Sequence, residues 1–355
     1  MGADDKTEYI YAVDLKNQNK KWSTPIGSRG GLDHGDGPRG APSVDGDLVY
    51  GIGSQGDLIC VKASNGDKVW MQELKGKEIG GGMQSGWGYS ESPLVDGDQV
   101  VCTPGGPKGT LAAFNKKTGD LIWRSKEWTD KAAYSSIVPD EIGGVHQYVQ
   151  MTGDSVAGVE ANDGKLLWKS ERKGPTAAIP TPIVSGDYVF ATSGYGAGCN
   201  LFKVTKDGDK FKSEPVYDDK ELVNHMVNHH GGVVLVGGDI YGYSDRGGWV
   251  CMEMKTGKLL WPKGKTETHL GKGSLTVADG CLYCYSEDTG TVVLAKASPE
   301  GWKEKGRFEL PEKSKVHGAK GGKFWTHPVV SNGKLYLRDE DLIFCYDVKG
   351  ATASR

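Results

Sequence analysis

The chain has no long hydrophobic run and no strong excess of charge of either sign. No part of its 355 residues is an uninterrupted apolar stretch of about 18, the length that a membrane-spanning helix needs. Lys and Arg number 43 against 46 Asp and Glu, which leaves a net charge of −3 and no basic stripe. We therefore expect no membrane span and no nucleic-acid partner.

Cysteine is scarce, and the seven residues include no adjacent pair. An odd number argues against a complete set of internal disulfides. Cys281 and Cys284 have C-x-x-C spacing but fall in one predicted strand, residues 281–285, where positions three apart face opposite sides of the sheet. They are therefore a poor zinc or redox pair.

Glycine and tryptophan, by contrast, are plentiful, with 54 and 10 residues. One phrase combines them: a small residue, then about six positions later a Gly after Asn, Asp or Thr, and a Trp four further on. It occurs at Cys60–Trp70, Ala113–Trp123, Gly158–Trp168 and Cys251–Trp261. Successive Trp residues lie 48, 53, 45 and 93 apart from Trp22 onward, and 93 is twice about 46. This period is typical of the four-stranded blades of a β-propeller.

Each repeat contains four short apolar runs separated by turn residues, as in Pro93–Val95, Gln99–Cys102, Thr110–Phe114 and Asp120–Trp123. First strands are predicted near residues 41, 92, 135, 181, 232, 274 and 327, and the N-terminus adds a third and fourth strand at 9–14 and 20–22. The sequence thus predicts one all-β domain over residues 1–355. We favour an eight-bladed propeller with an incomplete first blade, and seven blades are the alternative.

Three cysteines recur at the small position of the repeat. Aligned on the turn Gly or the following Asp, this column reads Ala12, Cys60, Ala113, Gly158, Phe202, Cys251, Ala295 and Cys345. We predict small buried core residues there. The repeated Trp is predicted to pack between neighbouring blades, with its indole N–H bound to a backbone acceptor.

The phrase Ala-x-Asp…Thr-Gly-x-x-x-Trp, carried by Ala12–Trp22, Asn115–Trp123 and Lys255–Trp261, resembles the PQQ-like β-propeller repeat family over nearly the whole chain. The resemblance implies the propeller fold. It implies two kinds of function, because the family includes quinoprotein dehydrogenases and non-catalytic propellers such as the lipoprotein scaffold of outer-membrane β-barrel assembly. It also implies a periplasmic or secreted location. Residues 1–6 have no signal-peptide core, and the chain opens within a repeat, so we expect any export signal upstream.

The quinoproteins of this family hold pyrroloquinoline quinone (PQQ) between a Trp floor and a disulfide of adjacent Cys, beside a calcium ion. This chain has no adjacent Cys pair. If the quinoprotein alternative holds, the resemblance implies PQQ and calcium. Position in the linkers alone then assigns Arg39 or Lys272 to the quinone and Glu91 and Asn228 to calcium. His230 or Glu91 would then be the base.

Linkers between the fourth strand of one blade and the first strand of the next converge at one face of a propeller, so their polar residues are candidates for binding. The segment Asn224–Gly232 holds three of the eight His residues. A structural role, in which they hydrogen-bond neighbouring linkers, is favoured; ligand binding or proton transfer comes next and metal binding last, so we expect no metal site. The candidate funnel residues are Arg39, Trp87, Glu91, Tyr134, Asn228, His229, His230, Lys272, Trp325 and His327.

Two functions remain open from the sequence. The first is a rigid, exported, non-catalytic scaffold, monomeric, which binds a protein partner or a small polar ligand at the funnel face. The second is a PQQ- and calcium-dependent oxidoreductase acting on alcohols or sugars. The mixture of bases, acids and aromatics in the linkers suits an anion, a sugar or a peptide loop.

Overall fold

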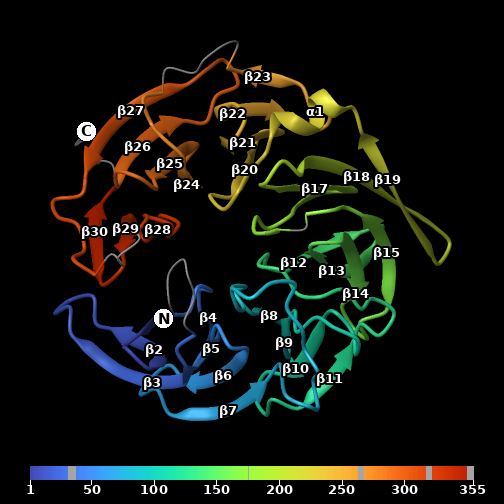
Figure 1. Ribbon diagram of the computed structural model, residues 1–355, viewed down its shortest axis with the longest axis vertical. Coiled ribbons are helices and arrows are strands. Elements are labelled where there is room, and N and C mark those ends of the chain that lie inside the picture. Colours follow the sequence, from blue (N-terminus) through green and yellow to red (C-terminus); the bar gives the residue numbers. More distant parts are fainter. Residues whose placement is uncertain (31–36, 175, 263–267, 317–321, 350–355) are drawn as a thin grey trace, which may run out of the picture. The chain divides into compact units, whose positions relative to one another are not determined.

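The structure, a computed structural model, describes residues 1–30, 37–174, 176–262, 268–316 and 322–349 (Figure 1). Within these residues, eight antiparallel sheets follow one another along the chain, six with four strands and two with three. The fold is all-β, that of an eight-bladed β-propeller, and its first blade is incomplete, as the repeat predicted. The seven-blade alternative is therefore wrong.

The chain divides into two compact units, Met1–Ala191 with Phe202–Pro215, and Thr192–Leu201 with Val216–Arg355. The prediction of one domain over residues 1–355 stays a prediction.

The first four sheets belong to the first unit. Their strands are β1 (Gly2–Ala3), β2 (Thr7–Val13) and β3 (Lys20–Ser28); β4 (Ser43–Asp45), β5 (Leu48–Ile52), β6 (Asp57–Lys62) and β7 (Lys68–Glu73); β8 (Leu94–Asp96), β9 (Gln99–Cys102), β10 (Ala112–Asn115) and β11 (Leu121–Arg124); β12 (Val138–Ile142), β13 (Val145–Met151), β14 (Ser155–Glu160) and β15 (Leu166–Glu171).

The fifth sheet includes residues of both units, and the second unit adds one helix and three sheets. The strands of the fifth sheet are β16 (Ile183–Ser185), β17 (Tyr188–Ser193), β18 (Gly198–Asp207) and β19 (Lys210–Tyr217). Next come α1 (Lys220–His225); β20 (Val233–Val236), β21 (Asp239–Ser244), β22 (Gly248–Glu253) and β23 (Leu259–Trp261); β24 (Gly273–Ala278), β25 (Cys281–Ser286), β26 (Thr291–Lys296) and β27 (Lys303–Glu309); β28 (Val329–Ser331), β29 (Lys334–Asp339) and β30 (Leu342–Asp347). First strands begin within three residues of their predicted starts.

The repeated phrase specifies a cross-strand pair. In five sheets the small residue of the third strand lies opposite the Trp of the fourth, at Ala12–Trp22, Cys60–Trp70, Ala113–Trp123, Gly158–Trp168 and Cys251–Trp261. The register shifts directly after the small residue each time, so each pair is followed by a β-bulge. The short side chain and the large ring therefore occupy a fixed place in each blade.

The Gly of the phrase receives the Trp of the preceding sheet. Gly119 has φ of +78°, and a Cβ built on it would lie 2.7 Å from Cδ2 of Trp70. Gly66 meets Trp22 and Gly164 meets Trp123 in the same way. Glycine is thus required both for the left-handed backbone and for the space that the ring fills.

The prediction for the indole N–H groups is confirmed in part. Trp22, Trp70 and Trp261 donate to the backbone oxygens of Ala63, Lys116 and Ser298, which belong to the next sheet in sequence. Trp123 and Trp168 instead donate to the side-chain oxygens of Gln99 and Gln147, on the second strands of their own sheets.

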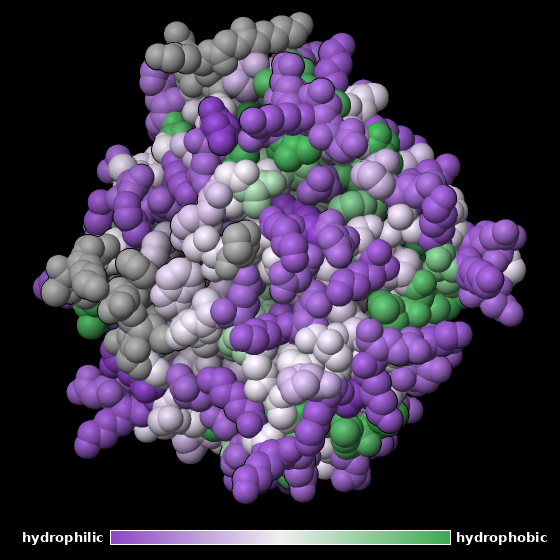
Figure 2. Space-filling model, turned by 45° about the vertical axis from the view of Figure 1, so that its right-hand side comes forward, coloured by the Kyte–Doolittle hydropathy of each residue, from purple (hydrophilic) through white to green (hydrophobic). Residues whose placement is uncertain are grey.

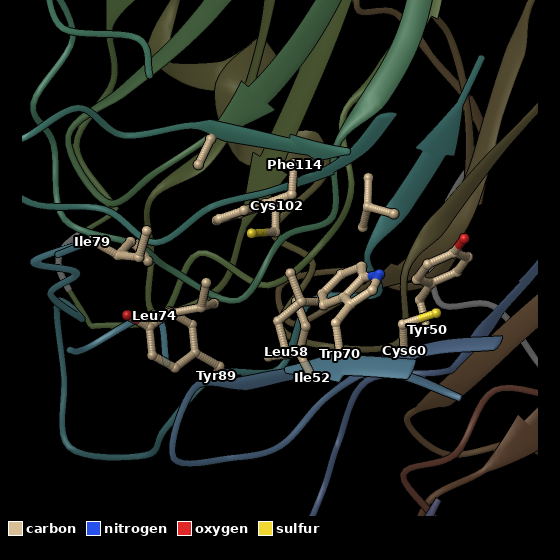
Figure 3. Packing of buried hydrophobic residues seen from close by; sticks show 13 residues of the cluster. Tyr50, Ile52, Leu58, Cys60, Trp70, Leu74, Ile79, Tyr89, Cys102 and Phe114 are labelled. Atoms are coloured by element: carbon tan, nitrogen blue, oxygen red, sulfur yellow. The ribbon is translucent and has the colours of Figure 1, made fainter. Parts of the chain in front are cut away.

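Most of the small column is buried, but its last member is not. Figure 3 shows Cys60 and Trp70 packed with residues of the same sheet beneath Phe114 and Cys102 of the next sheet. Cys345 is exposed, contrary to the prediction, and Ala12 is only partly buried. Among the described residues β30 pairs with β29 alone, so no fourth strand covers Cys345.

The surface is mainly hydrophilic on the face drawn in Figure 2, where hydrophobic residues form small separate groups. No helix in the described part of the chain has the length and apolar character needed to cross a membrane.

Candidate functional site

Three of the predicted residues come together in the first unit. Arg39 donates through Nη1 to the backbone oxygen of Trp87, and the rings of Trp87 and Tyr134 lie 6.3 Å apart between centroids. The Tyr134 hydroxyl contacts the hydroxyl of Ser85. Tyr134 is buried, so this group serves mainly to pack the linkers against one another.

Glu91, also predicted for this face, lies beneath it. Its side chain is 2% exposed, and its carboxylate accepts from the backbone N and Oγ1 of Thr103 at 2.5 and 2.7 Å. Gln150 in turn donates to Oγ1 of Thr103 at 2.7 Å and to the backbone oxygen of Ser135 at 2.9 Å. Burial raises the pKa of Glu91 to about 7, although the Thr103 bonds oppose this. The carboxyl is therefore part of a buried network that joins four segments of the chain.

The second unit assembles the other six predicted residues around one loop. Asn228 is buried and fully bonded: its Nδ2 donates to the backbone oxygens of Gly232 and Tyr243 at 2.9 Å, and its Oδ1 accepts from Gly232 N at 3.0 Å. A Cβ on Gly231 would collide with the carbonyl oxygen of Gly273, so this loop lies directly against β24. Asn228 thus positions His229 and His230 and does not itself face a ligand.

His229 and His230 stack, with ring centroids 4.6 Å apart and an interplanar angle of 27°. Tyr195 meets His229 edge-on at 4.8 Å, and Trp325 meets His230 at 5.4 Å. Four rings therefore form a continuous series, which we call the aromatic row: Tyr195, His229, His230 and Trp325. His327 lies beside it, with Nε2 3.1 Å from the backbone oxygen of His230.

Charged groups flank the aromatic row in pairs. Lys272 Nζ lies 2.7 Å from Asp245 and 2.9 Å from Nδ1 of His229. His230 Nε2 lies 2.8 Å from Oε2 of Glu287, and both side chains are nearly buried. Burial alone would raise the pKa of Glu287, but contact with His230 and the charge of Lys272 hold it below the usual value.

The protonation of His229 follows from these contacts. The pKa of His229 is lowered to about 4, mainly by burial and in addition by the neighbouring His230 and Lys272. An ammonium group has only hydrogens to donate, so Nδ1 of His229 is the acceptor and its proton lies on Nε2. His229 is thus a neutral donor near neutral pH.

Three contributors were missed by reading only the linkers before first strands. Tyr195, Asp245 and Glu287 lie in the turns between second and third strands, at β17–β18, β21–β22 and β25–β26. In an antiparallel sheet the end of the second strand lies beside the start of the first, so these turns share an edge with the linkers. That rule, applied to the sequence, would have found them.

The third His of the segment does not join the pair. His225 ends the unpredicted helix α1, which Asp219 caps by accepting from the backbone N of Glu221 and Leu222. Its Nδ1 lies 2.8 Å from the backbone oxygen of Gly257. The described residues contain no group of three or more His, Cys, Asp or Glu side chains arranged to hold a metal ion.

The residues proposed for PQQ and calcium do not fit those roles. Both oxygens of Glu91 and the whole amide of Asn228 are engaged by protein groups, which leaves neither available to calcium. Lys272 is held between Asp245 and His229. The geometry therefore does not favour a quinone and calcium centre built from Glu91, Asn228 and Lys272.

Together, the Trp-anchored blades and their linkers define a propeller of the PQQ-like class, with the aromatic row as the candidate site on its loops. The family model described as outer membrane protein assembly factor BamB matches residues 6–261, and the chain belongs to this PQQ-like propeller family.

Curated relatives of two kinds match. The chain is 25% identical over 249 residues to tetrathionate hydrolase of Acidithiobacillus ferrooxidans, covering 65% of this chain and 44% of that protein. It is 24% identical over 312 residues to outer membrane protein assembly factor BamB of Bordetella pertussis, covering 84% of this chain and 70% of that protein. The chain thus spans less than half of the hydrolase. The crystal structure of BamB from Moraxella catarrhalis superposes with a TM-score of 0.65 at 15% identity, over 97% of this chain and 92% of the other, which shows the shared fold.

Proposed function

We propose that this protein is a non-catalytic scaffold, monomeric and periplasmic or secreted, which binds a protein partner or a small polar ligand through the aromatic row. The observation that carries the proposal is the combination of stacked histidines with two exposed aromatic rings at their ends. The relatives named as outer membrane protein assembly factors support a scaffold role and an envelope location.

The arrangement of charges supports binding over catalysis. Lys272 is paired with Asp245 and His230 with Glu287, so the acids and bases near the aromatic row are held by one another. His229 is neutral with Nδ1 occupied, which makes it a hydrogen-bond donor and a weak base. A catalytic base needs an accessible lone pair and a pKa near the working pH.

Site-specific crosslinking tests the binding surface. A photoreactive phenylalanine analogue replaces Tyr195 in one variant and Lys258 in a control. Lys258 is also exposed and belongs to the same unit, but it lies in the turn between the third and fourth strands β22 and β23, at the opposite edge of its sheet from the linkers. We expect adducts at position 195 that disappear when His230→Ala is added to the same chain. Equal adducts at both positions, or adducts that ignore His230→Ala, would contradict the proposal.

Cofactor retention tests the absence of catalysis. The purified protein is incubated with PQQ and calcium, passed through a desalting column, and assayed for bound quinone and for dye reduction with alcohols and sugars. We expect no retention and no reduction. Tight retention with turnover would replace the scaffold by the quinoprotein alternative.

A further inference from the structure

The described part of the chain exposes two aromatic side chains to more than about a third of their area, and both belong to the aromatic row. Tyr195 is 56% exposed and Trp325 is 40% exposed. The other described Phe, Tyr and Trp residues are buried or partly buried in the blades. Exposed rings gathered at one place, with polar groups between them, are typical of a ligand surface.

The backbone at Tyr195 is held in an unfavourable conformation. Its φ is +55°, which is uncommon for a bulky residue, and glycines precede and follow it. A Cβ on Gly194 would lie 2.8 Å from Cα of His229, so the turn lies close against the His pair. Packing does not explain the choice of Tyr here, because most of its ring is exposed; a Gly would fit this backbone better.

Charges around the row cancel. Lys272, Lys323 and Arg246 bring three positive charges, and Asp245, Glu287 and Asp288 bring three negative charges. Lys272 and Lys323 are each in contact with a carboxylate, and Arg246 adjoins Asp245 in the chain. An anionic ligand therefore finds no net positive field to compensate the loss of its hydration.

The hydrogen-bonding groups offered at the row belong to side chains. The backbone oxygens of His230, Gly231 and Gly232 already accept from His327, Leu275 and Asn228. Gly232 N donates to Asn228. In contrast, Nε2 of His229 has no partner among the hydrogen bonds of the described residues, and Lys272 and Asp245 are partly exposed. An added peptide strand, which needs free backbone groups, is not favoured here.

We propose that the aromatic row binds a neutral carbohydrate, with one pyranose ring against Trp325 or Tyr195 and its hydroxyl groups on His229, Lys272 and Asp245. A pyranose has an apolar C–H face that packs on an aromatic ring and a rim of hydroxyls that donate and accept. This matches two exposed aromatic rings, Tyr195 and Trp325, beside a neutral donor and a paired cation and carboxylate. The inference rests on the proposed function, because it takes the row as the binding surface.

The test uses calorimetry and saturation-transfer NMR on the full chain with maltose, cellobiose and N,N′-diacetylchitobiose. We expect at least one neutral disaccharide to bind, with saturation transferred mainly to ring C–H protons. Trp325→Ala is expected to weaken binding about tenfold and Trp325→Phe to restore most of it. Lys258→Ala, at the opposite edge of its sheet, is the control and is expected to leave binding unchanged.

Tyr195→Gly separates binding from folding. It removes the exposed ring and relieves the left-handed backbone, so the thermal midpoint is expected to stay or rise while disaccharide binding falls. A variant that lost stability and binding together would instead indicate a structural role for Tyr195 and would overturn its assignment to the site.

Further experiments distinguish free sugars from polymers, and neutral sugars from an anionic sugar or a peptide. Cellobiose and chitobiose represent free sugars, and co-sedimentation with insoluble cellulose and chitin tests the same units in polymers; binding to either supports the proposal. Binding of glucuronate without any neutral sugar, or of a proline- and tryptophan-rich peptide that Trp325→Ala abolishes, overturns it. Crosslinks at position 195 without any sugar binding overturn this inference and leave the proposed function intact, whereas PQQ turnover overturns the proposed function.

Discussion

Lys272 donates to Nδ1 of His229 at 2.9 Å, and this contact fixes which nitrogen of the imidazole carries the proton. Long-range ¹H–¹⁵N NMR spectra are expected to show the Nε2–H tautomer of His229, neutral from pH 8 to below pH 5 because its pKa is about 4. Lys272→Met should raise that pKa only in part, since burial is the larger cause. An Nδ1–H tautomer in the unmodified protein would contradict the assignment.

His229 also makes stability depend on pH in a definite direction. The pKa of a His side chain is 6.5 in an unfolded chain, and that of His229 is about 4 in the folded protein, so the unfolded state binds more protons between these values. The free energy of unfolding therefore decreases as pH falls from 6.5 through 4, because protonation of this side chain favours the unfolded state. His229→Gln should flatten that part of the pH profile, measured by thermal unfolding; an unchanged profile would contradict the low pKa.

Glu91 is expected to act in the opposite direction. Its pKa rises from 4.5 to about 7 on folding because it is buried, so the folded state binds more protons in this range. The free energy of unfolding should fall as pH rises from 4.5 to 7, by roughly 3 kcal/mol. Glu91→Gln removes the buried charge, and its advantage over the unmodified protein should grow across this window. Parallel profiles for the two proteins would show that Glu91 is not the group responsible.

Gly119→Ala is expected to destabilise the protein for two separable reasons. The substituted residue has to keep φ of +78°, and its new Cβ lies 2.7 Å from Cδ2 of Trp70. Gly97→Ala is the matched control, because Gly97 has φ of +54° with nothing within 4 Å of its Cβ. We expect Gly97→Ala to lower the free energy of unfolding by about 1–3 kcal/mol through the backbone conformation alone. Gly119→Ala is expected to lower it by about 1–3 kcal/mol more because of the clash with Trp70. In a Trp70→Leu background, the loss of stability caused by Gly119→Ala should be smaller and the loss caused by Gly97→Ala should be unchanged. Chemical denaturation measures both.

Cys345 should be the one thiol of the native protein that reacts quickly with a maleimide. The other six are buried, and burial raises the pKa of Cys60 to about 11 and of Cys251 to about 12, which disfavours the reactive thiolate. Mass spectrometry is expected to show one label before denaturation and seven after it. Fast labelling in Cys345→Ser would contradict the burial of the others.

The blade pattern could be predicted from sequence because each of its contacts recurs. The pairing of Cys60 with Trp70 and the seat of Trp70 on Gly119 both involve residues at fixed spacings, and they repeat in several sheets. Exposure of Cys345 could not be predicted from the same column, because it depends on whether a fourth strand covers the third.

The candidate site, too, could be predicted from the sequence only in part. The linkers identified His229, His230, Lys272 and Trp325 as polar and aromatic groups near first strands, and the structure places them together. It was not evident that Glu91 and Asn228 are buried and fully bonded, since their partners come from other strands and turns.

By itself, the sequence determined the repeat and the residues that pack the blades, and it favoured eight blades over seven, because these rest on local turns and on periodic pairs at recurring spacings. The tertiary structure alone decided that Tyr195, Asp245 and Glu287 join the histidines, that burial, with His230 and Lys272, keeps His229 neutral, and that charges at the row cancel. These features join turns far apart in the chain, and no period in the sequence records which turns meet.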